Sequence, residues 1–173
     1  MEQFLASVER RAFRIAEIAT GNSEEALDIV QDAMIALARR YAEKSEQEWR
    51  PLFFTILQNG IRDWHRRAKV RNGIISLFSG WKRETASEDP IAQYADPEAR
   101  DPGDALMGAA SVEAVHHALR QLPLRQQQVF LLRAWEELSI AETARAMKIS
   151  EGSVKTHYSR ATEKLRSLLK DHQ

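Results

Sequence analysis

Apolar residues recur every three or four positions along two parts of this chain, and a segment without that periodicity lies between them. Such spacing places apolar side chains on one face of an α-helix. In the first part it predicts helices over 3–20, 23–41 and about 51–69, the last two separated by a polar, loop-like segment. In the second part it predicts helices over 111–121, 124–137 and 140–147, and a final one from 151 onward. We therefore expect an all-α fold.

The same spacing predicts the residues of the core. In the first part they are Phe4, Val8, Ala12, Ile15, Ala19, Ala26, Val30, Ala33, Leu37, Tyr41, Phe53, Leu57, Ile61 and Trp64. In the second part they are Val129, Leu132, Trp135, Val154, Tyr158, Ala161, Leu165 and Leu168. Gly60 lies within the third helix, where glycine costs roughly 1 kcal/mol relative to alanine. We therefore expect tight packing or a close ligand at that position.

The segment from about Val70 to Gly108 has no helical periodicity and contains Pro90, Pro97, Pro102 and four of the seven glycines. Nearly forty residues are too many for a structureless loop inside one compact domain. The sequence therefore predicts two small helical domains, residues 1–70 and 109–173, joined by a flexible acidic linker over 71–108.

The segment LSIAETARAMKISEGSVKTHYSRATEKLRSLL, residues 138–169, has the spacing of a helix-turn-helix. Ser139 and Glu142 form a capping box at the first helix, and Ser150 is placed to cap the second. The outer face of the second helix carries short hydroxyls and cations, a combination that suits the major groove of DNA. These residues are Ser153, Lys155, Thr156, Ser159 and Arg160. A solvated amphipathic hairpin is the alternative interpretation.

Charge is segregated along the chain although the formal net charge is zero. Residues 61–83 hold seven cations and one anion, whereas residues 84–106 hold one cation and seven anions. Residues 139–173 hold seven cations and four anions. Because local potential and not net charge attracts a polyanion, the two basic blocks are compatible with nucleic-acid binding.

Composition excludes several classes of protein. The absence of cysteine rules out disulfides and thiolate metal sites. No apolar run approaches the roughly 20 residues that span a bilayer, and the first residues lack a signal-peptide pattern, so we expect a soluble cytoplasmic protein without stable membrane insertion. Adjacent His116 and His117 point in different directions on a helix, and no phosphate loop or nucleophile elbow is present. We expect no enzyme activity, catalytic residue, cofactor or metal.

Three blocks in this order resemble the bacterial extracytoplasmic-function sigma factors, the minimal two-domain members of the sigma-70 family of RNA polymerase specificity subunits. They are DIVQDAMIAL from Asp28 to Leu37, LFFTILQNGIRDWHRR from Leu52 to Arg67, and the helix-turn-helix itself. The resemblance covers about 120 of the 173 residues. It implies a protein that binds core RNA polymerase, recognises the minus-thirty-five element and melts the minus-ten element of promoter DNA. It also implies control by an anti-sigma factor.

The resemblance assigns roles to particular residues. The implied partners on core polymerase are its clamp helices and its flap, and contact with the clamp helices falls to an exposed stripe of the second helix. The stripe consists of Asp28, Gln31, Asp32 and Ile35, with Arg39 nearby. The minus-thirty-five element would meet the helix-turn-helix face described above, together with His157. That histidine stands where an arginine is more usual in the family.

The third helix corresponds to the family's promoter-melting helix. Its pattern of an asparagine, an aspartate four residues later and paired arginines is met by Asn59, Asp63, Arg66 and Arg67. The resemblance places Asn59 near a flipped base, with the acidic loop from Glu43 to Arg50 as the other wall of the pocket. Arg62, Arg66 and Arg67 would hold phosphates, together with Lys69 and Arg71, and Asp63 is expected to pair with a neighbouring arginine. Candidate stacking aromatics are Trp49, Phe54 and Trp64, the last expected to lie mostly in the core.

Two questions stay open at this level. The apolar segment GIISLFSGW, from Gly73 to Trp81, suits a lipid surface, a polymerase groove or, in the interpretation we favour, an intramolecular partner. The alternative function is a helix-turn-helix transcription regulator with an N-terminal sensor or dimerisation domain; a protein that sequesters polymerase without binding DNA is a third class. The Asn59 to Arg67 pattern, on a basic and aromatic helix, argues against a sensor domain.

Overall fold

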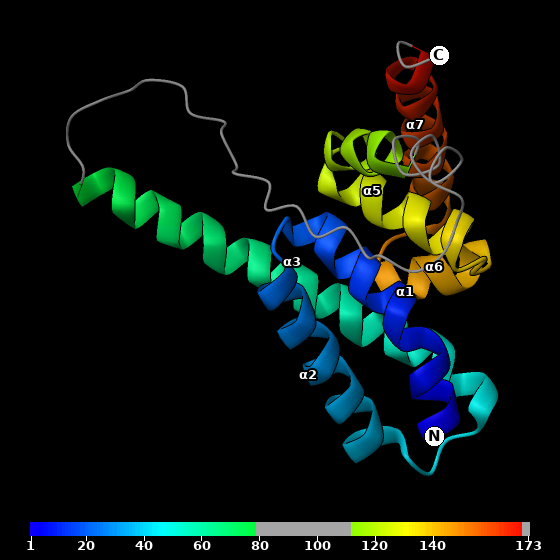
Figure 1. Ribbon diagram of the computed structural model, residues 1–173. Helices are drawn as coiled ribbons and strands as arrows, with labels where there is room; N and C mark the ends of the chain where they lie inside the picture. Colours follow the sequence, from blue (N-terminus) through cyan, green and yellow to red (C-terminus); the bar gives the residue numbers. More distant parts are fainter. Residues whose placement is uncertain (79–111, 171–173) are drawn as a thin grey trace, which may run out of the picture.

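The computed structural model describes residues 1–78 and 112–170, and their side chains over 1–71 and 112–169. Within these ranges every regular element is helical. The expectation of an all-α fold of two small helical domains is therefore confirmed (Figure 1). The acidic part of the linker lies outside the described residues, as do the side chains of the Gly73–Trp81 segment.

Three helices form the N-terminal domain: α1 (Glu2–Thr20), α2 (Ser23–Tyr41) and α3 (Glu46–Phe78). They pack around the predicted stripes, with Ile15, Leu37 and Leu57 fully buried. Tyr41 and Trp64 are half-buried at the edge of this core. Gly60 fits the expectation of tight packing, because a Cβ added there would lie 3.1 Å from Cγ2 of Ile29 on α2.

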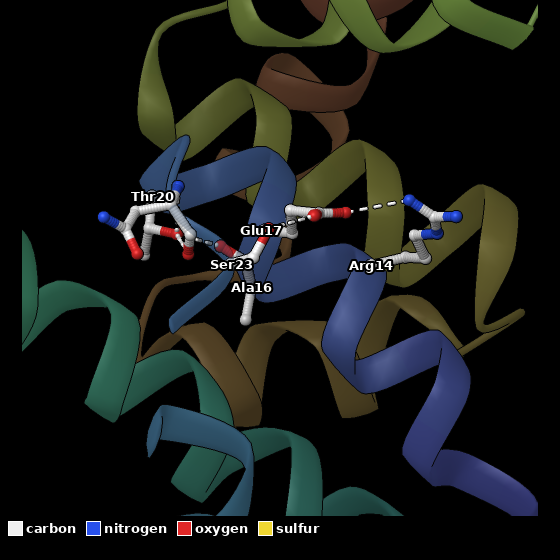
Figure 2. Close-up of polar contacts among 6 residues, drawn as sticks. Arg14, Ala16, Glu17, Thr20 and Ser23 are labelled. Atoms are coloured by element: carbon white, nitrogen blue, oxygen red, sulfur yellow. Dashed lines mark hydrogen bonds and ion pairs between the residues drawn. The ribbon is translucent and has the colours of Figure 1, made fainter. Parts of the chain in front are cut away.

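The turn between α1 and α2 is fixed by polar side chains, as Figure 2 shows. Gly21 adopts a left-handed conformation, with φ of 67°, and ends α1. Glu17 accepts hydrogen bonds from Arg14 at 2.9 Å and from Ser23 at 2.7 Å, while the Thr20 hydroxyl donates to the carbonyl of Ala16 at 2.9 Å. This arrangement sets the angle at which α2 leaves the turn. The N-cap of α2 is Asn22, whose side chain accepts from the amide of Glu25.

The third helix is longer at both ends than the sequence predicted. The loop expected over 42–50 is helical from Glu46 onward, and the helix expected to end near Lys69 continues through residue 70 to Phe78. Ser45 explains the early start, because its amide and hydroxyl both donate to the Glu48 carboxylate at 3.1 and 2.9 Å. Pro51, at which the predicted helix began, lies inside α3. Figure 1 shows the far end of α3 extending beyond the rest of the molecule.

The C-terminal domain contains a helix over 112–120, α5 (Leu124–Phe130), a single wide π-turn named η1 (Leu131–Trp135), α6 (Ile140–Met147) and α7 (Glu151–Lys170). The sequence predicted one α-helix over 124–137, and this was wrong beyond Phe130. The amide of Glu136 donates to the carbonyl of Leu131 at 3.1 Å, five residues back. Val129 and Leu132 are buried as expected, whereas Trp135, expected inside, is 39% exposed.

The two domains are in contact, which the sequence analysis did not predict. Helix α6 packs along α3, α5 approaches α1, and the buried residues of both domains form one continuous cluster (Figure 1). This contact decides which of the candidate functional side chains reach solvent.

Candidate nucleic-acid interface

The helix-turn-helix is built as its sequence predicted. The Ser139 hydroxyl accepts from the amide of Glu142 at 3.1 Å, and the Glu142 carboxylate accepts from the amide of Ser139 at 2.8 Å. Lys148 ends α6 in a left-handed conformation, and Ser150 then accepts from the amide of Ser153 at 3.2 Å at the start of α7. These local bonds fix the angle between α6 and α7.

Helix α7 turns an apolar stripe inward and a polar face outward. Val154, Ala161 and Leu165 are buried, and the Tyr158 ring stacks on Phe130 with centroids 5.8 Å apart. The outward face carries four exposed candidates, which are Lys155, Thr156, Ser159 and Arg160. No ion pair between described residues involves Lys155 or Arg160. The two cations therefore present their charge to solvent on one helix face.

Three polar side chains on α7 are less available to a ligand than the two cations. Ser153 is half-buried and shares a hydrogen bond of 2.9 Å with the Ser150 hydroxyl, and the Thr156 hydroxyl donates to the carbonyl of Gly152 at 3.0 Å. His157 is half-buried, and its Nδ1 atom is buried without a hydrogen-bond partner among the described residues. Lys155 and Arg160 are therefore the strongest ligands for an anion on this face.

The stripe proposed for a protein partner lies on α2. Asp28, Gln31, Asp32 and Ile35 are all exposed, as is Arg39, and the side chain of Ile35 is 49% exposed. Leu27, one residue before the stripe, is also 44% exposed. Two exposed aliphatic side chains beside two carboxylates on one helix are typical of a protein-binding surface.

The candidates on α3 fall into two groups. Arg66 and Arg67 are exposed, and Arg66 pairs with Asp63 at 3.2 Å, as predicted for that aspartate. Asn59 and Arg62 are half-buried and bonded to each other, the Asn59 side-chain oxygen accepting from the Arg62 guanidinium. The same guanidinium also donates to the carbonyl of Met147 on α6 at 2.9 Å. Burial, followed by the nearby charge of Arg125, lowers the pKa of Arg62.

The candidate stacking aromatics belong largely to the core. Phe54 is fully buried and packs edge-on against Phe53. The Trp49 indole donates to the carbonyl of Tyr41 at 3.0 Å and packs beside Phe4. Trp64 is half-buried against the core, as predicted. In this closed arrangement Phe54 is therefore not available to a base.

Glu136 is a candidate that no sequence pattern indicated, and its side chain is fully buried between the two domains. Its carboxylate lies 3.5 Å from Nε of Arg11 on α1 and 3.4 Å from Nη2 of Arg50 on α3. The Arg50 guanidinium also donates to the backbone carbonyl of Glu136. Burial raises the pKa of the Glu136 carboxyl, and the two arginines oppose that rise. No periodic pattern marks Glu136, because its burial arises from contact between domains.

Other chemistry is sparse within the described ranges. No group of three or more histidine, aspartate or glutamate side chains among these residues is arranged to hold a metal ion. His116 packs edge-on against Trp135, and burial, followed by the charge of Arg14, lowers its pKa. No described helix combines the length and apolarity needed to cross a membrane.

Models of the sigma-70 family match both domains. Sigma-70 region 2 matches residues 1–71, and sigma-70 region 4 matches residues 112–165. The chain therefore belongs to the sigma-70 family, and within it to the extracytoplasmic-function sigma factors, which are transcription initiation factors.

Known proteins agree with this assignment over nearly the whole chain. The extracytoplasmic-function sigma factor SigM of Mycobacterium tuberculosis is 29% identical, over 97% of this chain and 76% of its own. The sigma factor RpoE of Bartonella quintana, solved with the anti-sigma factor NepR, has the same fold with a TM-score of 0.65 at 21% identity, covering 98% of both chains. CnrH, solved with the cytosolic domain of CnrY, has a TM-score of 0.63 at 20% identity, covering 99% of this chain and 88% of CnrH.

Proposed function

We propose that this sigma factor divides promoter recognition between its two domains, with α7 docking the minus-thirty-five element and α3 opening the minus-ten element. The observation that carries the proposal is the coexistence of three surfaces in one chain: the cationic face of α7, the basic stretch of α3 and the acidic, apolar stripe of α2. An ordinary helix-turn-helix regulator requires only the first. The domain boundaries that go with this division are 1–70, 71–108 and 109–173.

The α2 stripe suits the polymerase clamp helices. Asp28 and Asp32 are four residues apart and so stand on one face, with Gln31 beside them and Ile35 one turn further on. Carboxylates and an amide can accept hydrogen bonds from arginines, and Ile35 and Leu27 can bury apolar area in the same contact.

The α7 face suits upstream promoter DNA. A recognition helix places its N-terminal half in the major groove, where Lys155 and Arg160 can reach guanine or phosphate. Ser153, Thr156 and Ser159 are short enough to permit close approach, and His157 contributes a weaker contact than arginine. Exposure of the two cations supports this docking.

The α3 helix would act on the downstream element. Arg66 and Arg67 are exposed and suited to phosphates, which position the strand without reading its sequence. Asn59 offers both a donor and an acceptor to a flipped base, and Arg62 lies one turn further along the helix. Extruding a base costs a few kcal/mol, so the strand must gain contacts on the protein.

An anti-sigma factor is the expected regulator, because RpoE of Bartonella quintana, which has this fold, was solved in complex with the anti-sigma factor NepR. We further propose that the chain works in the cytoplasm, as a subunit of polymerase without catalytic activity of its own. The alternative, a helix-turn-helix regulator with an N-terminal sensor or dimerisation domain, predicts DNA binding without any dependence on core polymerase.

Transcription in vitro with core polymerase on a promoter library tests the proposal. Initiation from a defined promoter class should require this protein.

Three sets of variants test the individual surfaces. Asp28→Lys with Asp32→Lys should abolish association with core. Lys155→Ala with Arg160→Ala should remove upstream protection in footprints. Asn59→Ala should leave both intact and reduce permanganate reactivity of unpaired thymines downstream. Glu2→Lys with Glu9→Lys, an equal change of charge at two exposed residues of α1, is the control for core binding. DNA binding with no polymerase-dependent initiation would refute the proposal.

A further inference from the structure

Two arginines of the α5–η1 unit bond to the two ends of α6. Arg133, in the middle of η1, donates to the carbonyl of Leu138, two residues before α6 begins. Arg125, in the first turn of α5, donates to the carbonyl of Met147, the last residue of α6, at 3.1 Å. The spacing of the two arginines along the chain matches the length of α6, roughly 12 Å for eight helical residues. One helical unit therefore holds its neighbour at both ends.

The bond from Arg133 lies at the less regular end of α6. Residues 136–139, between η1 and α6, form no regular helix, and Glu137 among them has a positive φ of 51°. Leu138 ties this connection back to η1, because its amide donates to the carbonyl of Leu132 at 3.0 Å and its carbonyl accepts from Arg133. Without the guanidinium, the path of the chain into the capping box of α6 would be less restricted.

At the other end, Arg125 bonds to a carbonyl that α6 itself leaves without an amide partner. The last four carbonyls of an α-helix have no intrahelical donor, and a cation is favoured beside them. Arg62 of α3 donates to the Met147 carbonyl as well, so the two arginines share one acceptor. The bond from Arg125 is the one that forms within the C-terminal domain.

Arg133 also contacts α7 directly. Its guanidinium carbon lies 5.9 Å from the centre of the Tyr158 ring, within the range of a cation–π contact. The same ring stacks on Phe130, one turn before Arg133, with an angle of 16° between the ring planes. Tyr158 lies between the exposed cations Lys155 and Arg160 along the chain. The ring held by Arg133 and Phe130 therefore belongs to the segment of α7 that presents those cations.

From these contacts we infer that Arg125 and Arg133 are positioning residues for upstream promoter binding. They brace α6 at both ends and, through Tyr158, fix the orientation in which α7 presents Lys155 and Arg160. A helix-turn-helix reads base edges only when its second helix enters the groove in a defined orientation, whereas phosphates attract cations without reading sequence. Loss of the brace should therefore reduce discrimination between sequences more than general attraction to DNA. The role in promoter binding rests on the function proposed above, whereas the brace itself does not.

Amide hydrogen exchange in the free full-length protein tests the brace. Arg125→Met and Arg133→Met remove the guanidinium and keep a long apolar side chain. In each variant the amides of α6 and of the first turn of α7 should exchange roughly threefold faster or more, while those of α2 and of the helix over 112–120 should not change. Tyr158→Leu should have the same effect, whereas Tyr158→Phe keeps the ring and should not. Arg120→Met, the same change at an exposed arginine of this domain, is the matched control.

Promoter binding by the assembled holoenzyme tests the positioning role. Core polymerase with each variant is titrated, at several salt concentrations, with a promoter duplex that carries the upstream element selected from the library and with a duplex in which that element is scrambled. Loss of the brace should reduce the ratio of the two affinities and leave the salt dependence unchanged. A direct phosphate contact would instead weaken both duplexes equally and reduce the salt slope by about 1.

The two measurements separate the possible failures. Unchanged exchange in both Arg125→Met and Arg133→Met, or the same acceleration in Arg120→Met, would overturn the brace. Faster exchange with an unchanged affinity ratio, or an equal loss for both duplexes with a smaller salt slope, would overturn the positioning role. A parent protein that forms no promoter-dependent holoenzyme would refute the proposed function, and the exchange result alone would then decide whether the brace exists.

Discussion

At the scale of single residues, the packing around two glycines illustrates how context decides the effect of one methyl group. Gly60 faces Ile29 across the contact between α3 and α2, whereas the nearest atom to a Cβ at Gly152 would be the Ser150 hydroxyl oxygen at 3.9 Å. Both positions are helical, so replacing glycine by a residue with a side chain gains helix propensity at each. Only at Gly60 must a buried neighbour move.

We predict opposite changes in stability at the two positions. Gly60→Val should lower the free energy of unfolding by roughly 1–3 kcal/mol, because the added groups overpack the contact with Ile29. Gly152→Ala should raise it by up to about 1 kcal/mol, because alanine restricts the unfolded chain and clashes with nothing. Urea denaturation followed by circular dichroism measures both. A Gly60→Val variant as stable as the parent would show that α2 and α3 are not tightly packed there.

The residue scale also shows what the sequence could predict. Exposure of Lys155 and Arg160, the ion pair of Asp63 and the capping box of Ser139 follow from local spacing, and all three were expected. The burial of Glu136 and the capture of Arg62 depend on contacts between residues about 85 positions apart. Helical periodicity describes one helix at a time and contains no information on such contacts.

At the scale of elements, helix ends decide the geometry of both candidate DNA surfaces. The Ser45–Glu48 pair starts α3 earlier than Pro51 suggested, and it has the same Ser-x-x-Glu spacing as the box at Ser139. Applying that signal at Ser45 would have placed the helix start correctly. The π-turn after Phe130 has no comparable signal, since its register depends on how η1 packs.

The capping box should make a measurable contribution to stability. Ser139→Ala should cost about 0.5–2 kcal/mol, because the amide of Glu142 loses its acceptor. Ser159→Ala, at an exposed position on α7, is the matched control and should change stability little. Hydrogen bonds from Ser139 lower the pKa of the Glu142 carboxyl below its usual 4.5. Its stabilisation is therefore present above pH 4.5 and lost as pH falls through the lowered pKa.

Thermal unfolding of the parent protein and Glu142→Gln at several pH values tests this assignment. The parent should be the more stable at neutral pH, and the difference should shrink on acidification below pH 4.5. A difference that does not vary with pH would mean that the charge of Glu142 contributes nothing to the start of α6.

At the scale of the whole molecule, the ionisation of Glu136 affects the balance between the closed form, with the two domains in contact, and an open form, with the domains apart. Burial raises the pKa of this carboxyl in the closed form, despite Arg11 and Arg50 and with a small further rise from Glu137. The closed form therefore binds the proton more tightly than the open form does. Protonation favours closure, and the favourable contribution is lost as pH rises through the raised pKa.

Glu136→Gln should consequently be more closed than the parent protein near pH 7, as judged by energy transfer between labelled cysteines introduced at two exposed residues, Glu9 of α1 and Lys164 of α7. The two proteins should converge as pH falls toward 4.5, where the parent carboxyl becomes neutral. Titration of His116, whose pKa is lowered, works in the opposite direction but is common to both proteins and cancels in the comparison. If Glu136→Gln were the more open protein at pH 7, the attraction of the arginines would outweigh the cost of burial.

The closed contact between α3 and α6 lies within one chain, so the ratio of closed to open molecules does not depend on how much protein the cell makes. A contact between separate proteins is lost on dilution, whereas a contact between two domains of one chain is not. The fraction of free molecules with the domains in contact should therefore be the same at every protein concentration.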